Sequence, residues 1–81
     1  MIYRLYRTGA VTDIDAALTV NTIPSKSFLF DVNNSDFIEF KKNLQNNAIL
    51  QNTNGEEMPS SSVSDILLQF EAGTLTIADA D

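Results

Sequence analysis

The sequence of 81 residues contains no cysteine and no histidine, and these two absences remove several kinds of chemistry. Without cysteine the chain has neither a disulfide nor a thiol nucleophile. Without histidine it lacks the commonest metal ligand and the usual general base. The composition therefore argues against an enzyme, and we expect neither a cofactor nor a metal ion.

The short length leaves little room for a core. We expect one domain over residues 1–81. A domain of this size buries only about 60% of the surface that its unfolded chain exposes. Small scaffolds often depend on a disulfide, a metal or a neighbouring chain. Since the first two are disfavoured here, elimination predicts association with protein partners.

Basic residues are also scarce. Five Lys and Arg residues stand against eleven Asp and Glu residues, for a formal net charge of −6. Binding to phosphate backbones depends on clustered basic side chains, and the five here are scattered. We therefore expect neither nucleic acid nor an anionic membrane as partner. Solubility is the simplest reason for the acidity. A partner with a basic surface, or DNA mimicry, is the sharper alternative.

Long apolar runs are missing as well. No stretch approaches the roughly 20 apolar residues that span a bilayer. The first seven residues are interrupted by Arg4 and Arg7 and lack the apolar segment of a signal peptide. We expect a chain that is made and used, or assembled, inside a cell.

The N-terminal third predicts a β-hairpin. Residues 2–7 mix aromatic and aliphatic side chains in a strand-like way, and Thr8-Gly9-Ala10 is a plausible turn. Residues 14–20 then alternate with period two, which predicts a half-buried strand. One side of this strand carries Ile14, Ala16, Leu18 and Val20, and the other carries Asp15, Ala17 and Thr19. A helix from Thr12 is the competing interpretation.

The middle of the chain predicts a third strand and a helix. Residues 28–30 form a short apolar run after the break at Ile23-Pro24. The polar stretch 31–36 is a turn in which Asn34 or Ser35 caps a helix over about 36–46. Three apolar residues at helical spacing define its buried face, namely Phe37, Phe40 and Leu44. Asn46-Asn47 marks its end.

The last third predicts a loop and a second helix. Residues 51–62 are polar and are expected to form a mobile loop, with a hairpin turn at Asn54-Gly55 as the alternative. Ser62 and Asp65 resemble a capping box for a helix that ends before Gly73. Its apolar face consists of Val63, Ile66, Leu67 and Phe70. Residues 74–77 alternate like an edge strand, and residues 78–81 are expected to fray. The predicted fold class is α+β.

One segment has the beginning of a calcium-binding loop. Asp31, Asn33 and Ser35 place oxygen ligands at alternating positions. The sixth position should be glycine but is Asp36, and the twelfth should be glutamate but is Lys42. A capping turn therefore explains these residues better than a calcium site.

Other candidate catalytic groups also lack partners. The acid pairs Asp13/Asp15 and Asp79/Asp81 have no third ligand nearby in the sequence, and we interpret them as solvated charges. The hydroxyls of residues 60–62 have no histidine to activate them, and no lysine shows a sign of burial. A linker and a helix cap account for these serines. No catalytic residue is predicted.

The phenylalanines are candidates for both core and contact. Core packing is the default for all five. In so small a domain we expect some to reach an interface as well, and we predict that Phe28, Phe30 and Phe70 contact a partner.

Three segments together resemble small proteins and terminal segments of tailed-bacteriophage virions. The first is the opening Met1-Ile2-Tyr3-Arg4-Leu5-Tyr6. The second is Ile23-Pro24 followed by Phe30-Asp31-Val32-Asn33-Asn34-Ser35-Asp36-Phe37-Ile38-Glu39-Phe40, which is similar to a Phe-Asp-Pro-x-Asn-x-Asp-Tyr-x-x-Tyr start of a helix. The third runs from Phe70-Glu71-Ala72-Gly73-Thr74 to Ala78-Asp79. Val32 replaces the proline of that pattern, and residues 41–69 resemble an insertion.

The resemblance implies a non-enzymatic structural protein of the virion, associated with the tail or its fibres. Such a protein would dock in multiple copies on a larger tail, neck or capsid component, in a homo-oligomeric or otherwise symmetric assembly. Its location would be the virion, after assembly in the host cytoplasm. The alternative is an acidic inhibitor or adaptor that occupies a basic site on a host protein.

Overall fold

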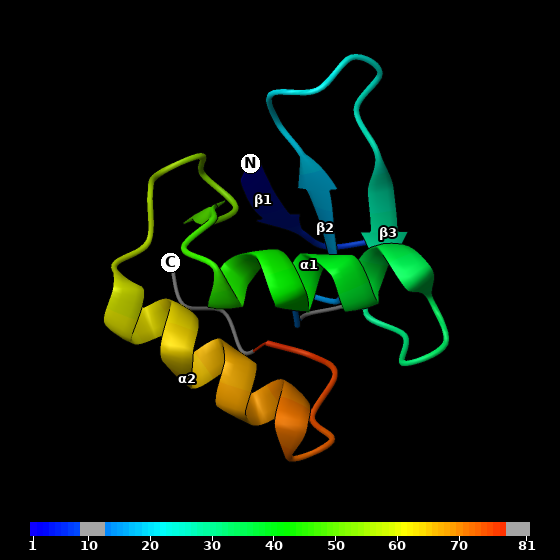
Figure 1. The fold of residues 1–81 in the computed structure, drawn as a ribbon, viewed down its shortest axis with the longest axis vertical. Coiled ribbons are helices and arrows are strands. Elements are labelled where there is room, and N and C mark those ends of the chain that lie inside the picture. The colour runs from blue at the N-terminus through cyan, green and yellow to red at the C-terminus, as the bar shows by residue number, and fades with distance from the viewer. Residues whose placement is uncertain (9–12, 78–81) are drawn as a thin grey trace.

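The strands of the fold come from both halves of the chain. The computed structural model describes residues 1–8 and 13–77. Its elements follow in the order β1 (Ile2–Tyr6), β2 (Ala16–Thr19), β3 (Ser27–Leu29), α1 (Ser35–Gln45), β4 (Ile49–Gln51) and α2 (Ser60–Glu71). The strands lie in the order β3-β2-β1-β4, and β4 runs parallel to β1 while the other pairs are antiparallel. Figure 1 shows α1 crossing in front of the strands. The predicted α+β fold is confirmed.

The N-terminal hairpin and the third strand are confirmed. β1 and β2 pair with Tyr3 opposite Thr19 and Tyr6 opposite Ala16, and β3 continues the meander on β2. The competing helix from Thr12 is wrong for residues 16–19, which form a strand. Part of the predicted Thr8-Gly9-Ala10 turn lies outside the described residues.

The alternation in β2 has the predicted period, but the more polar side faces the helices. Ala17 belongs to the core and Thr19 is buried, whereas Leu18 is half-buried on the opposite face. Two adjacent alanines make both faces of this strand small and apolar, so the alternation does not reveal which one is inside. Pairing decides it, because Ala17 lies opposite Leu5 of β1 and shares its face.

Asparagine residues mark both ends of helix α1, as predicted. The Asn34 side-chain oxygen accepts hydrogen bonds from the backbone N–H groups of Asp36 (2.8 Å) and Phe37 (3.4 Å). At the other end Asn46 is the C-cap, and Asn47 adopts a left-handed conformation with φ of 70°. This backbone turns the chain out of the helix and directs it into β4.

Strand β4 was not predicted from the sequence. A strand of three residues is too short to show a period of two, and its position depends on pairing with β1, which is 47 residues away in the sequence. Ile49 lies opposite Ile2 in the register, and Leu50 opposite Tyr3. β4 thereby extends the sheet beside β1 and brings Leu50 into the core.

The predicted loop 51–62 is too long at both ends. Gln51 belongs to β4, and residues 60–62 form the first turn of α2. Between them Asn52 organises a turn, because its side-chain oxygen accepts hydrogen bonds from the N–H groups of Asn54 (2.9 Å) and Glu56 (3.0 Å). Gly55 has φ of 83°, and an added Cβ would lie 3.2 Å from the Arg4 guanidinium. The turn at Asn54-Gly55 is thus present, and the mobility of the segment stays a prediction.

In the C-terminal part of the chain, two predictions differ from the structure and one is confirmed. The capping box at Ser62 is wrong, because Pro59 occupies the N-cap and no side chain caps the helix. Gly73, with φ of 90°, follows the C-cap Ala72 as predicted. The edge strand over 74–77 is reduced to one bridge, in which Ile77 and Ile14 exchange two hydrogen bonds of 2.8 Å. Residues 78–81 lie outside the described part of the chain.

The core lies between one face of the sheet and the two helices, and aromatic rings fill its centre. Phe40 is fully buried, and its ring centroid lies 4.8 Å from that of Tyr3 in β1 and 5.2 Å from that of Phe28 in β3. Phe70 of α2 contacts Phe37 at 5.0 Å. These contacts connect both helices with two strands, so the cluster holds the layers together.

We predict that Phe40→Ala removes a large part of the stability. Truncation of a buried phenylalanine typically costs about 3–5 kcal/mol. Ile38→Ala is the matched control, because Ile38 lies on the same helix and is 51% exposed. Thermal unfolding followed by circular dichroism should show a strongly lowered midpoint for Phe40→Ala and a nearly unchanged one for Ile38→Ala. Equal midpoints for the two variants would contradict the packing described above.

A hydrogen bond also joins β1 to α1. The Asn43 side-chain amide donates to the Tyr3 hydroxyl at 2.7 Å. Burial raises the pKa of the Tyr3 hydroxyl, and this outweighs the hydrogen bond from Asn43, which lowers it. Because the folded state disfavours the ionised ring, the unfolded chain loses this proton first as the pH rises.

We therefore predict that Tyr3 contributes a loss of stability above about pH 10, the ordinary range for tyrosine ionisation. Between the unfolded and the raised folded pKa, the unfolded chain binds fewer protons, so the free energy of unfolding falls as pH rises. Denaturant unfolding of the wild type and Tyr3→Phe from pH 8 to 11 measures this effect. The stability advantage of the wild type should shrink above pH 10, and a constant difference would contradict the assignment.

Candidate partner-binding surfaces

The three phenylalanines predicted to contact a partner lie in the core. Phe28, Phe30 and Phe70 are 5%, 6% and 5% exposed. The rings of Phe30 and Phe70 contact each other at 5.0 Å, and Phe28 joins them through Phe40. In this fold they contact one another and leave almost no surface for another protein. Candidate contacts therefore have to come from other side chains.

The acid pair at the start of β2 is divided between two environments. Asp13 is exposed, whereas the Asp15 carboxylate accepts hydrogen bonds from the Thr8 hydroxyl (2.5 Å) and the Thr8 backbone N–H (3.0 Å). The hydroxyl of Thr8 lowers the pKa of the Asp15 carboxyl more strongly than burial raises it. Asp15 is thus a structural acceptor that joins the strand to Thr8, rather than a solvated charge. The second pair, Asp79/Asp81, lies outside the described residues.

The remaining polar motifs have local structural roles. Asp31 accepts a hydrogen bond from the Asn33 N–H at 2.9 Å and leads into the Asn34 cap, so this segment is the predicted capping turn. The Lys41 ammonium lies over the Phe37 ring at 4.8 Å. Within residues 1–8 and 13–77, no group of three or more acidic side chains is placed to hold a metal ion. None of the helices in these ranges is long and apolar enough to cross a membrane.

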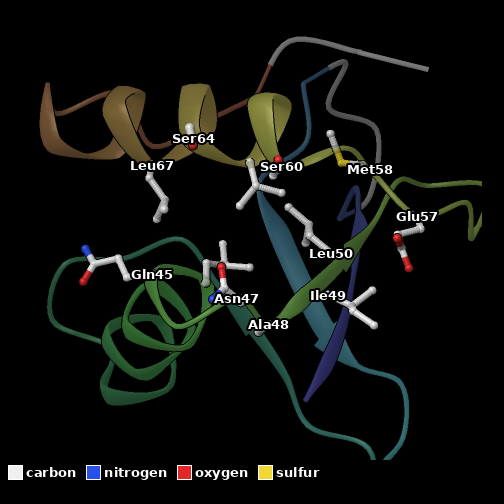
Figure 2. Close-up of a pocket in the computed structure, with 12 residues that line it drawn as sticks. Gln45, Asn47, Ala48, Ile49, Leu50, Glu57, Met58, Ser60, Ser64 and Leu67 are labelled. Atoms are coloured by element: carbon white, nitrogen blue, oxygen red, sulfur yellow. The ribbon is translucent and has the colours of Figure 1, made fainter.

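A groove of about 400 Å³ opens between the end of α1, β4 and α2. Its floor consists of the buried side chains of Leu44, Leu50 and Val63, and its walls include Met58 and Leu67. Figure 2 shows Leu67 extending from α2, and Leu50 pointing from β4, into the space between the helices. The rim is polar and contains Gln45, Asn47, Glu57, Ser60 and Ser64. An apolar floor with a polar rim is the usual anatomy of a binding groove.

A second candidate surface is the sheet face that points away from the helices. We call it the outer sheet face, and by the strand registers it carries Ile2, Arg4, Tyr6, Ala16, Leu18, Ser27, Leu29, Ile49 and Gln51. Leu29 is 52% exposed and Ile49 is 38% exposed, whereas Ile2, Tyr6 and Leu18 are half-buried and Ala16 is fully buried. Arg4 carries the one formal charge in this set, and its Nε donates a hydrogen bond to the Gln51 side-chain oxygen at 3.0 Å. This face is thus mainly apolar and has no acidic residue among its strand positions.

Sequence reasoning missed both surfaces for different reasons. The groove depends on β4, which no local pattern revealed, and on the segment that follows the turn at Asn54-Gly55. Leu29 could have been found, because it stands between Phe28 and Phe30, and a strand that buries both phenylalanines must direct Leu29 outward. Ile49 gave no such signal, because its strand was not recognised.

Comparison with protein-family models, with curated proteins and with solved structures found no match.

We predict that Asp15→Asn lowers the stability at neutral pH. An amide oxygen replaces the carboxylate as acceptor for the two Thr8 donors, and hydrogen bonds to charged groups are the stronger ones. Because the folded pKa of Asp15 is lowered, its contribution is present above the ordinary aspartate pKa and is lost as pH falls below it. Thermal midpoints at pH 7 and pH 3 should therefore differ less for Asp15→Asn than for the wild type. The exposed Asp13→Asn is the control, and identical behaviour of both variants would refute the role of Asp15.

Proposed function

We propose that this chain is a non-enzymatic structural protein of a tailed-bacteriophage virion, which docks in multiple copies on a larger tail, neck or capsid component. Two lines of support come from the sequence: the resemblance to virion proteins, and the lack of both histidine and cysteine. The observation that carries the proposal is the outer sheet face, which neither helix covers.

The composition of the outer sheet face supports a protein contact. Its exposed and half-buried apolar or aromatic side chains are Ile2, Tyr6, Leu18, Leu29 and Ile49, beside the polar Arg4, Ser27 and Gln51. A sheet needs a partner on an apolar face, because that surface gains free energy when it leaves water. The face also lacks carboxylates at its strand positions, although the whole chain has a net charge of −6. The strand positions of the face are therefore free of the charge that keeps the chain soluble, and Glu57, which pairs with Gln51 beyond β4, places a carboxylate at its edge.

The small size of the outer sheet face supports attachment in multiple copies. Strands of three to five residues in a four-stranded sheet give a projected area of roughly 200–300 Å². A stable interface usually buries about 800 Å² on each partner. One such face is too small for firm attachment by itself. Repeated copies or a further contact surface would supply the remainder.

A single pair of variants tests this role. In purified particles, quantitative mass spectrometry should find the wild-type chain at a fixed copy number. Leu29→Glu puts a charge on the outer sheet face and should lower incorporation by about tenfold or more, since burying an unpaired charge is costly. Ile38→Glu is the matched control, because Ile38 on α1 is 51% exposed and lies away from that face.

Thermal unfolding of the same variants separates a loss of docking from a loss of folding. Both variants should keep the wild-type thermal midpoint, and only Leu29→Glu should be missing from the particles. Absence of the wild-type chain from purified particles would reject the virion role. Normal incorporation of Leu29→Glu would reject the outer sheet face as the contact.

The second candidate is an acidic inhibitor or adaptor that occupies a basic site on a host protein. The distribution of charge along the sequence favours an inhibitor or adaptor of this kind, because no Lys or Arg follows Lys42. The four acids at positions 56, 57, 65 and 71 are all exposed. Such a protein would be absent from purified particles and would be recovered with a host protein instead.

A further inference from the structure

The groove between α1, β4 and α2 is large enough for side chains of another protein. A cavity of about 150 Å³ holds a benzene ring, so a groove of about 400 Å³ has room for two or three apolar side chains. Leu44, Leu50 and Val63 form a floor that belongs to the rigid core. The groove is therefore preformed, which lowers the entropic cost of binding.

The segment after β4 occupies part of the sheet edge at this groove. The Met58 N–H donates to the Leu50 carbonyl at 2.8 Å, and the Asn52 N–H donates to the Glu56 carbonyl at 2.8 Å. The chain thus pairs the residues on either side of Gln51 with its own following segment. A ligand strand would have to displace these hydrogen bonds to pair along the edge. The groove instead suits a segment that offers side chains, as an amphipathic helix does.

Acidic residues stand at both ends of the groove-lining stripe of α2. Ser60, Ser64 and Leu67 line the groove, and Glu71 follows Leu67 by four residues, so it lies on the same stripe one turn on. Glu57 is on the rim at the opposite end. Both glutamates are exposed. The stripe from Ser60 to Glu71 is about 18 Å long.

The charges near the groove favour a basic segment over a second copy of this chain as the occupant. Glu57 is the one charged residue among those that line the groove, and no Lys or Arg is among them. Lys42 is 200° around the α1 axis from the groove-lining Leu44, by the 100° step of a helix. The Arg4 guanidinium lies beside Gly55 and donates to Gln51. A second copy would bring a like-charged α2 to this place, which is unfavourable. A basic segment complements both glutamates.

From these features we propose that the groove binds an amphipathic helix of a partner protein, with Lys or Arg residues near both ends of its apolar stripe. About three turns of such a helix match the length of α2. Two or three apolar side chains at i, i+3 or i+4 spacing enter the groove. The basic residues lie beside Glu57 and Glu71. This site is separate from the outer sheet face, apart from Ile49, and it does not depend on the virion role.

A labelled peptide of about 14 residues, or roughly four helical turns, serves as the probe. It carries leucines at helical spacing and lysines near both ends, and fluorescence anisotropy measures its affinity for the purified full chain. One control peptide has glutamate in place of each lysine, and another has the same composition with the leucines shuffled. The lysine peptide should bind at least about tenfold more tightly than either control.

Matched variants on α2 locate the binding site. Ser64→Arg places a bulky cation inside the groove and should weaken binding by about tenfold or more. Gln69→Arg adds the same side chain to an exposed position on the far side of α2 and should leave the affinity unchanged. Thermal midpoints confirm that both variants fold. Ser60→Arg, also on the rim, replaces Ser64→Arg if the latter is unstable.

Charge neutralisation tests the electrostatic part. The double variant Glu57→Gln/Glu71→Gln should bind several-fold more weakly and show a flatter dependence on salt. Asp65→Asn, on the outer side of α2, is the control. Equal binding of the lysine and glutamate peptides would overturn the proposal. So would wild-type affinity in folded Ser64→Arg, or an equal loss in Gln69→Arg. Because the assay uses no particles, its failure leaves the virion role to its own test.

Discussion

The packing of one aromatic cluster is the constraint on which the rest of the structure depends. The Phe40 ring lies within 6.4 Å, centroid to centroid, of five other rings that come from β1, β3, the segment after β3, α1 and α2. All five phenylalanines of the chain are in this cluster. A domain without a disulfide must obtain its cohesion from such contacts, and edge-to-face pairs add to the free energy of simple burial. Their use in the core also explains why the candidate contact surfaces consist mainly of aliphatic side chains.

Local signals in the sequence were sufficient where a few neighbouring residues determine the structure. The spacing of Phe37, Phe40 and Leu44 and the cap at Asn34 identified α1 because both act within a few turns of one helix. The same reasoning failed for β4, whose three residues become a strand only by pairing with β1. It also failed at Ser62, because the helix has its N-cap three residues earlier, at Pro59, without any side-chain cap. Both candidate surfaces depend on these nonlocal features, and so the sequence predicted the core far better than the site.

The helices cover one side of the sheet only, and chain length is the physical reason. Two helices of 11 and 12 residues are enough to cover one face of a small four-stranded sheet, and residues 1–8 and 13–77 contain no further helix for the other. Antiparallel sheets commonly leave one face in water, but that face is then usually polar. Here the exposed Leu29 and Ile49 interrupt that pattern. A short chain that keeps such side chains outside is better matched to an assembly than to life as an isolated monomer.

The two candidate surfaces differ in charge, and this difference determines how they can work together. The outer sheet face has no carboxylate at its strand positions, whereas the groove has Glu57 on its rim and Glu71 on the same helical stripe. A mainly apolar face whose one formal charge is that of Arg4 provides contact area with little orientation. Fixed charges at the ends of a groove impose direction and select against acidic ligands. Each surface alone is small. Held on one rigid core, they would act as two linked sites, and occupation of the first raises the effective concentration for the second. Bivalent attachment of this kind allows an 81-residue chain to be held firmly without enlarging either interface.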